Sequence, residues 1–457
     1  MCTRAIRQSS QPDWFLMGCP FKLGWYCIAA IVGISFGLGA CSSSSSAPPV
    51  RWLPAKSIPL DDFALVNDLS DLPEMKGIDS QVVRMMRQLE IVGASLAIAK
   101  DGRLVYAKGY GYADKEKQIK MQPYHLLRIA SVSKLVTAVG IMKLVEQGKL
   151  KLSDKVFGKN GLLNDPDLLK INDKRMEEIE VVHLLTHAGG WRNRFRADPL
   201  FRTLEIAQWM KTKPPADIRT VIRFMLTQEM IAEPGVFYDY SNFGYCVLGE
   251  VIKKVTGMPY EKYIQTQVLQ PLGIHRMQIG HSRLAQHAPV EVKYYDYQGA
   301  RLKLGIEGKG DSVSRVDGGT HIEALGPSGG WIATPADLLK LVLAVDGLPG
   351  KPDMLQAETI ETMIGNAAQT DSSKTKIIGW RAADKDRWWR TGSLAGTGIV
   401  VMRQNDGISW VLVTNTGTWK EARFSFDIMA AMDRGIRSVK YWTKQDLFEW
   451  MKRFQTN

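Results

Sequence analysis

Segments rich in β-forming residues lie at both ends of the sequence, and a long helical region separates them. Near the start, the runs 94–100 and 104–110 flank Asp101-Gly102, and Asp-Gly between two such runs is a strong hairpin signal. Near the end, Asn405-Asp-Gly407 joins two further runs in the same way. The late segments that we expect to be strands are 376–381, 386–390, 398–403 and 408–414.

The middle of the chain, residues 150–310, is instead helical and rich in loops. Strands that are split between two ends of a chain must meet in space to bury their apolar faces. The sequence therefore predicts an α/β (α+β) fold: an antiparallel sheet flanked by helices, with an inserted all-α lobe. The expected helices of the lobe are 203–212, 216–228, 242–256 and 259–269, and two closing helices are expected at 421–434 and 443–453.

The first 40 residues have the features of an export signal. The apolar stretch 23–40 ends in Leu38-Gly-Ala-Cys41, which resembles a bacterial lipobox, and the Ser-rich tract 42–49 is typical of a flexible tether. We expect cleavage before Cys41 and lipidation of that cysteine, and the alternative is an uncleaved anchor helix. Either way the bulk of the chain lies outside the cytoplasm. A lipid anchor places it in the bacterial cell envelope, and Ser42 favours the outer membrane, facing the periplasm.

The predicted organisation has four parts: a lipoprotein-type signal peptide (1–40), a tether (41–79), the main domain (80–435) and a C-terminal helical extension (436–457). The net charge of +12 comes from scattered basic residues, and no nucleic-acid-binding motif is present. Only Cys246 of the five cysteines lies in the main domain, which excludes a disulfide framework there. It stands in an apolar run, so we expect it to be buried.

Ser131 and Lys134 form the first chemical constellation. They stand at the start of a strongly helical run, and residues three apart on a helix share one face. The amine can accept the serine proton, and the unpaired N–H groups of the helix end can support the oxyanion formed on attack. The Ser-x-x-Lys spacing is that of serine β-lactamases and penicillin-binding proteins, although it also occurs by chance.

Two later segments supply compatible groups. Tyr240-Ser-Asn242 offers a phenol that a nearby ammonium can activate as an acid or base, and an amide that can hold the substrate or orient a lysine. Arg390-Thr391-Gly392-Ser393 ends a Trp-rich strand, where a glycine permits close approach to a strand edge and a cation can hold a carboxylate. Each segment alone also has a purely structural interpretation.

Together the three motifs resemble those of the class C β-lactamase family, which also includes D,D-peptidases, D-aminopeptidases and β-lactamase-type esterases. Three intervening blocks agree with the family pattern: Val182-His-Leu-Leu-Thr-His-Ala-Gly-Gly190, residues 233–256, and Gly329-Gly-Trp-Ile-Ala-Thr-Pro-Ala-Asp337-Leu. The resemblance spans about residues 80–435. It implies a β-lactamase/transpeptidase-like fold and a serine hydrolase that needs no metal or organic cofactor.

The resemblance also implies residue roles. Ser131 is the nucleophile, Lys134 its base partner and Tyr240 a further proton carrier. Asn242, Arg390, Thr391 and Ser393 face the substrate, and the N–H groups of Ser131 and Ser393 form the oxyanion hole. The family usually has lysine or histidine where this chain has Arg390. Arginine keeps the cation but is forked and essentially never neutral, which weakens the expectation of β-lactam turnover.

Two other motifs are weaker candidates for a functional site. Gly326-Pro-Ser328-Gly-Gly330 fits the nucleophile elbow of α/β-hydrolases, but that elbow needs a strand before it and a helix directly after it. His183 and His187 have helical i, i+4 spacing for a metal pair, but no third ligand is evident, so a structural role is favoured.

The sequence therefore predicts a lipid-anchored serine hydrolase that forms an acyl-enzyme on an ester, amide or β-lactam carbonyl of a small-molecule or peptide substrate. One alternative is a peptidase of D-amino-acid peptides from the cell wall. A second alternative is a pseudoenzyme that only binds such ligands.

Overall fold

The computed structural model describes residues 65–191, 198–365 and 377–452. The described residues all belong to one compact unit. The predicted signal peptide and Cys41 lie outside the described residues. Within the ranges that are described, no helix has both the length and the apolar composition needed to cross a membrane.

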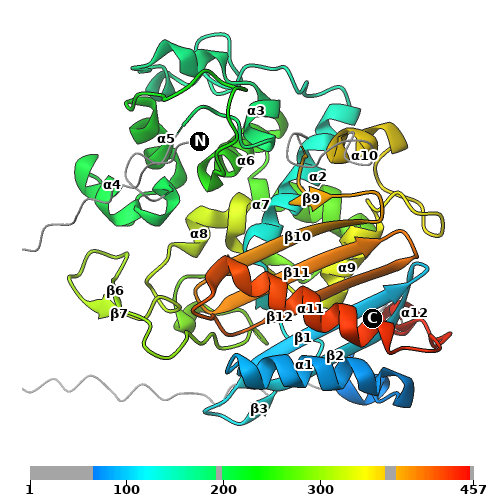
Figure 1. The fold of residues 1–457 in the computed structure, drawn as a ribbon. Helices are drawn as coiled ribbons and strands as arrows, with labels where there is room; N and C mark the ends of the chain where they lie inside the picture. The colour runs from blue at the N-terminus through cyan, green and yellow to red at the C-terminus, as the bar shows by residue number, and fades with distance from the viewer. Residues whose placement is uncertain (1–64, 192–197, 366–376, 453–457) are drawn as a thin grey trace, which may run out of the picture. The chain divides into compact units, whose positions relative to one another are not determined.

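A seven-stranded antiparallel sheet unites the two ends of the domain (Figure 1). The strand order is β3-β2-β1-β12-β11-β10-β9, and β1 pairs with β12, so the early hairpin and the late strands meet at the centre of the sheet. The predicted antiparallel sheet is therefore confirmed. The strands are β1 (Gly93–Lys100), β2 (Arg103–Asp114), β3 (Ile119–Lys120), β9 (Ala382–Ala383), β10 (Arg387–Leu394), β11 (Thr397–Gln404) and β12 (Ile408–Thr414).

Both faces of the sheet are covered by helices. Successive side chains of a strand point to opposite faces. In β12, Trp410 and Leu412 belong to one buried cluster and Val411 and Val413 to the other. The first cluster lies under α1 (Lys76–Gln88) and α11 (Phe424–Arg437), which pack on each other and lie in front of the sheet in Figure 1. The other face carries α2 (Ser133–Glu146) and α9 (Pro335–Leu343).

The helical lobe lies between the two halves of the sheet in sequence, as predicted. Among the described residues it holds α3 (Val181–Leu185), α4 (Thr203–Trp209), α5 (Ile218–Leu226), α6 (Asn242–Thr256), α7 (Tyr260–Tyr263) and α8 (Ile322–Leu325). A small sheet of β4 (Leu127–Arg128), β8 (Trp331–Ala333) and β5 (Gln278–Ile279) lies beside it, with β6 (Lys303–Leu304) paired to β7 (Ser312–Val313). The remaining helices are α10 (Ala357–Ile364) and α12 (Leu447–Lys452).

Two predicted elements differ from the structure. The strand expected at 376–381 is wrong for the residues that are described, because 377–381 form bends and the strand is β9. Gly379 adopts a left-handed φ of 78° there and lies so close to α2 that a Cβ would approach Ala138 to 2.8 Å. The helix expected at 259–269 is an α-helix only as far as Tyr263 and continues as a wider π-helical turn.

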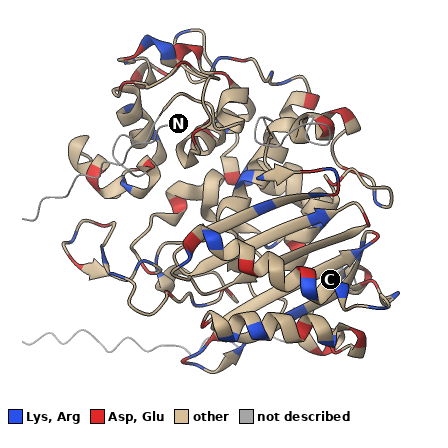
Figure 2. Ribbon diagram, in the orientation of Figure 1, with Lys and Arg blue, Asp and Glu red and all other residues tan. Residues whose placement is uncertain are grey.

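Elements continue across both predicted domain boundaries. α1 starts at Lys76, before the predicted start at 80, and α11 ends at Arg437, after the predicted end at 435. Figure 2 shows acidic and basic residues interspersed along the described chain, in keeping with the scattered charges of the sequence.

Candidate active site

Ser131 lies in a tight turn directly ahead of α2. The turn is a 3-10 helix over Ala130–Val132, and α2 begins at Ser133. Ala130 has a left-handed φ of 44°, a conformation that costs free energy for any residue with a Cβ. Its carbonyl oxygen and that of Ser131 both accept a hydrogen bond from the Ser133 N–H. The strained residue therefore fixes the backbone immediately before the predicted nucleophile.

Lys134 is buried beneath Ser131, in the first turn of α2. Its Nζ donates to Asn242 Oδ1 and to the Ser328 carbonyl oxygen, both at 2.7 Å, and lies 3.4 Å from Ser131 Oγ. Burial lowers the pKa of Lys134. An amine that is less basic than usual, and held by two neutral acceptors, can accept a proton more readily near neutral pH.

Tyr240 makes the shorter contact to Ser131. Its hydroxyl donates to Ser131 Oγ at 2.7 Å, and Arg390 Nη2 lies 3.4 Å from the same hydroxyl. Burial raises the pKa of Tyr240, but the neighbouring charges of Lys134 and Arg390 outweigh it and lower the pKa to about 8. The phenol is thus placed and tuned to exchange a proton with Ser131.

Asp198 places Asn242 and was missed in the sequence analysis. α6 begins at Asn242, and the buried Asp198 carboxylate accepts from the Asn242 N–H at 2.6 Å and from the Leu200 N–H at 3.0 Å. A carboxylate at a helix N-terminus pairs with otherwise unsatisfied N–H groups. The sequence signal for it was the Asp198-Pro199 pair, in which Asp198 caps a short 3-10 helix.

Arg390 is buried and turned towards protein groups. Its Nε donates to the Ser131 carbonyl oxygen at 2.9 Å and its Nη1 to the Trp380 carbonyl oxygen at 3.2 Å. The guanidinium thus ties β10 to the turn that carries Ser131 and adds positive charge beside Tyr240. The predicted role of Arg390 in holding a substrate carboxylate stays a prediction, and the geometry provides a different use for its charge.

Gly392 explains how β10 can pass so close to Ser131. A Cβ at Gly392 would lie 2.8 Å from the Ile129 carbonyl oxygen and 3.0 Å from the Ser131 nitrogen. A substrate backbone was expected to approach this glycine, and the structure shows instead an approach to the chain's own turn that carries Ser131. Thr391 and Ser393, on either side of Gly392, line the same cleft as Ser131.

The cleft has a volume of about 580 Å³, and all of the predicted substrate-facing residues line it. Phe201, Tyr238 and Phe426 stand at its wall with 41%, 59% and 69% of their surfaces exposed. Arg381 and Arg423 also line it, and both are exposed. Arg381 Nη1 donates to the Tyr238 hydroxyl at 2.6 Å. The cleft therefore combines aromatic surfaces with two accessible cations, neither of which the sequence analysis singled out.

The weaker motifs have other uses. Ser328 is fully buried, and its carbonyl oxygen holds Lys134 while its hydroxyl donates to the Leu325 carbonyl oxygen. Cys246 is buried in α6 as expected, and burial raises the pKa of its thiol to about 12.

His187 supports Tyr240 from behind. Its Nδ1 accepts from the Ser241 N–H at 3.2 Å, and its carbonyl oxygen accepts from the Asp239 N–H at 2.7 Å. The imidazole lies 4.5 Å from the Tyr240 ring, measured between ring centres. His187 thereby binds both neighbours of Tyr240 in the chain. The partner of His183 Nδ1 is the Glu180 N–H, at the start of α3.

The sequence matches the profile of the beta-lactamase family over residues 78–431. The chain belongs to that family. Protein flp of Staphylococcus aureus (strain COL) is 30% identical over 195 residues, which is 43% of this chain and 36% of flp. The match thus spans only about a third of flp. Esterase EstB of Burkholderia gladioli is 26% identical over 324 residues, which is 68% of this chain and 80% of the esterase.

The fold is shared with a solved enzyme of the same architecture. D-amino acid amidase from Ochrobactrum anthropi SV3 superposes with a TM-score of 0.58 at 23% identity, covering 82% of this chain and 99% of the amidase. The predicted β-lactamase/transpeptidase-like fold is thereby confirmed. Together the family and its members make the chain a β-lactamase-fold hydrolase.

Proposed function

We propose that the chain is a serine hydrolase that forms an acyl-enzyme on an ester, amide or β-lactam carbonyl. The observation that supports this most directly is the hydrogen-bonded set Tyr240, Ser131 and Lys134 at the base of an open cleft. Tyr240, as phenolate, or Lys134, as neutral amine, takes the proton of Ser131 as its Oγ bonds to the carbonyl carbon. The same proton passes to the leaving group when the tetrahedral species collapses, and water then releases the acyl group.

The test is a substrate panel assayed on the wild type and on Ser131→Ala. The panel holds short p-nitrophenyl esters, a chromogenic cephalosporin and a D-Ala-D-Ala peptide. We expect turnover of at least one substrate, a mass increase on Ser131 in the trapped wild type, and a loss of at least about 10³-fold in kcat in Ser131→Ala. Turnover that survives in Ser131→Ala contradicts the proposed nucleophile. Absence of both turnover and adduct favours the pseudoenzyme.

A more specific proposal is that the preferred substrate carries a carboxylate, as in a carboxypeptidase. Asp198 is the acidic residue among those that line the cleft, and its carboxylate is occupied by backbone N–H groups. Arg381 and Arg423 leave the cleft with accessible positive charge. Such a cleft attracts an anion and repels the free ammonium of an amino acid amide.

Paired substrates that differ only in a terminal carboxylate or its amide test this preference. We expect the carboxylate form to be used with the higher kcat/KM. Arg381→Gln should reduce that preference by about tenfold, the effect expected from the loss of one charged contact. Equal kcat/KM for both forms in the wild type contradicts the proposed preference for a carboxylate. It leaves the proposed acyl-enzyme mechanism intact.

We also propose that the chain is a lipoprotein of the bacterial cell envelope, on the strength of the lipobox-like sequence at Cys41. The expected result is incorporation of labelled palmitate and membrane fractionation in the wild type, and loss of both in Cys41→Ser. Membrane fractionation without label favours the uncleaved anchor.

A further inference from the structure

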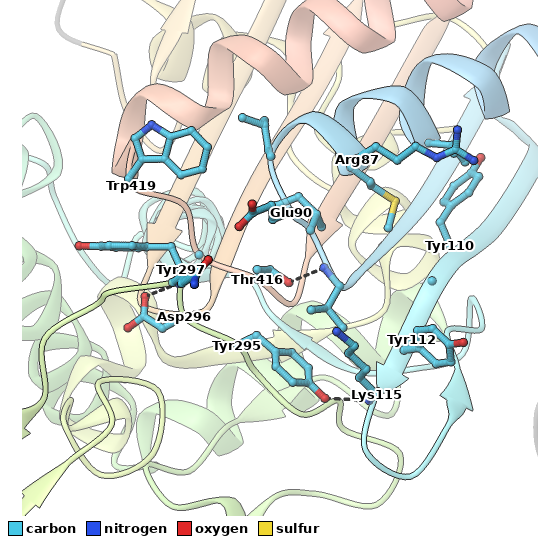
Figure 3. A pocket seen from close by; sticks show the side chains of 18 residues that line it. Arg87, Glu90, Tyr110, Tyr112, Lys115, Tyr295, Asp296, Tyr297, Thr416 and Trp419 are labelled. Carbon is cyan, nitrogen blue, oxygen red and sulfur yellow. Dashed lines mark hydrogen bonds between the residues drawn. The ribbon is translucent and has the colours of Figure 1, made fainter.

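A second cavity, of about 760 Å³, lies outside the catalytic cleft (Figure 3). It is bounded by the end of α1, by β2, and by two loops that carry Tyr295–Gln298 and Thr416–Trp419. We call it the aromatic cavity after the four rings that line it with accessible surface, those of Tyr112, Tyr295, Tyr297 and Trp419.

The aromatic cavity is next to the catalytic cleft. Gly417 lines it, and a Cβ on Gly417 would lie 2.9 Å from the nitrogen of Gly396, in the turn between β10 and β11. Trp419 lines the cavity, and Ala422, three residues later, lines the catalytic cleft. Three residues span at most about 11 Å. One short segment therefore separates the two sites, so a chain of several linked units can reach from one to the other.

Backbone hydrogen bonds join the segments that form the aromatic cavity. The Tyr295 N–H donates to the Asn415 carbonyl oxygen and the Gly417 N–H to the Tyr295 carbonyl oxygen, both at 2.8 Å. The Thr416 hydroxyl accepts from the Val92 N–H at 2.9 Å. These bonds join three distant parts of the chain. The cavity is thus pre-formed, as small-molecule sites usually are.

Glu90 is held in an unusual backbone conformation at the edge of this cavity. It follows α1 with a left-handed φ of 55°, and this conformation is unfavourable in free energy for any residue that has a Cβ. In Figure 3 its side chain extends towards the side of the cavity formed by Trp419 and Tyr297. Its carboxylate has no hydrogen bond or ion pair with any residue of the described chain, nor do the side-chain nitrogens of Arg87 and Lys115.

This set of groups restricts the ligand. A purely apolar molecule would cover the unpaired charges of Arg87, Glu90 and Lys115 and leave them unsolvated. A polyanion meets the carboxylate of Glu90, and a polycation meets Arg87 and Lys115. A sugar ring has an apolar C–H face that packs on an aromatic ring and hydroxyls that both donate and accept. It can therefore pack on flat aromatic surfaces and hydrogen-bond to charged groups of both signs at once.

We propose that the aromatic cavity binds an uncharged oligosaccharide, with Trp419 as its main contact and Glu90 as a hydrogen-bond acceptor. Trp419 is 55% exposed, so its ring surface is available to a ligand. The site is distinct from Ser131 and does not depend on the proposed chemistry there. It would hold the carbohydrate part of a larger molecule, or a glycan to which the protein is recruited, beside the catalytic cleft.

Calorimetric titration of the full chain in detergent tests the proposal, with cellotetraose and the tetramer of N-acetylglucosamine as probes. We expect saturable binding of at least one probe and a loss of at least about tenfold in affinity in Trp419→Ala. Glu90→Gly is the second variant. It removes the carboxylate and relieves the left-handed backbone, so it should weaken binding without lowering the melting temperature.

Tyr441→Ala is the matched control, because Tyr441 is an exposed aromatic residue outside both cavities, and it should bind as the wild type does. Hydrolysis of a short p-nitrophenyl ester should be equal in Trp419→Ala and the wild type. No binding of either probe at millimolar concentration overturns the proposal, and so does equal binding by Trp419→Ala. Binding of an uncharged tetrapeptide with the same dependence on Trp419 identifies a peptide site instead and also overturns it.

Discussion

The proton chemistry of the candidate site depends on Tyr240 and on the two cations beside it. Burial raises the pKa of Tyr240, and the charges of Lys134 and Arg390 lower it further than burial raises it, to about 8. Arg390 thus contributes positive charge beside Tyr240, while its guanidinium donates to the Ser131 and Trp380 carbonyl oxygens. A base that titrates near 8 is available to a hydrolase at a mildly alkaline pH.

This predicts the pH dependence of the reaction. If the phenolate of Tyr240 accepts the Ser131 proton, the active form lies above the pKa, so kcat/KM should rise through about pH 8 and level off beyond it. At pH 7 roughly a tenth of the enzyme has the base form. Tyr240→Phe should remove this limb and reduce kcat about 10²–10⁴-fold. A flat profile from pH 6 to 9 in the wild type would be evidence against the assignment.

His187 is predicted to act by positioning Tyr240. It accepts hydrogen bonds from the residues on both sides of Tyr240 and has a left-handed φ of 58°. Burial, together with the charges of Arg390 and Lys134, lowers the pKa of His187, which keeps Nδ1 free to accept. His187→Ala removes that acceptor and should reduce kcat/KM about 10–100-fold, which is the effect expected when an acid–base group is misplaced.

His187→Asn is the conservative variant for that experiment. Its amide oxygen can accept from Ser241, and asparagine tolerates a left-handed backbone, so it should recover most of the activity. The pH profile separates positioning from stability, because only a displaced Tyr240 moves the apparent pKa of the rising limb. A profile that stays at the wild-type pKa in His187→Ala would leave His187 with a purely structural role.

At the scale of elements, the site depends on the close crossing of β10 and the turn before α2. Gly392→Ala puts a Cβ within 2.8 Å of the Ile129 carbonyl oxygen and 3.0 Å of the Ser131 nitrogen. We expect a loss of about 1–3 kcal/mol in the free energy of unfolding and a larger loss of kcat, since the nucleophile turn must move. Denaturant unfolding and burst kinetics measure the two effects.

Gly244→Ala is the control for this crossing. Gly244 lies in α6, where the nearest atoms to a new Cβ are 3.7 Å away, so the substitution should keep activity and stabilise the helix slightly. Equal losses in Gly392→Ala and Gly244→Ala would mean that the crossing has no special role.

The same elements show which features the sequence could predict. The hairpins at Asp101-Gly102 and Asn405-Gly407 follow from local turn chemistry, and both are present as the β1–β2 and β11–β12 pairs. Ser131 and Lys134 likewise lie close together because they are three residues apart, with the 3-10 turn that holds Ser131 running directly into α2. The segment 377–381 misled the prediction because Ile378 and Trp380 are buried outside any strand, where Gly379 passes close to α2. Arg390 and Asp198 bind partners that are distant in sequence, and no local pattern marks such partners.

At the scale of the whole molecule, the described fold begins earlier than the predicted start of the domain. Leu65, Met75 and Ile78 are buried, and α1 packs on α11 from the other end of the chain. A chain that starts at Ile58 keeps all of these groups, whereas one that starts at Ser80 loses these three buried apolar side chains and the first turn of α1. Removal of one large buried side chain costs about 2–5 kcal/mol, and a domain has only about 5–15 kcal/mol in total.

We therefore expect the chain that starts at Ile58 to melt at the temperature of the longer protein and to keep the hydrolytic activity of the longer protein. The chain that starts at Ser80 should melt at a clearly lower temperature or fail to fold. Calorimetry and circular dichroism on the two truncated chains measure the difference. Matching melting temperatures would show that α1 and the segment before it are accessory, and would support a boundary at residue 80. A lower melting temperature would show that α1 is needed to cover the face of the sheet that carries Leu96, Trp410 and Leu412, because its buried residues belong to the same cluster as these three.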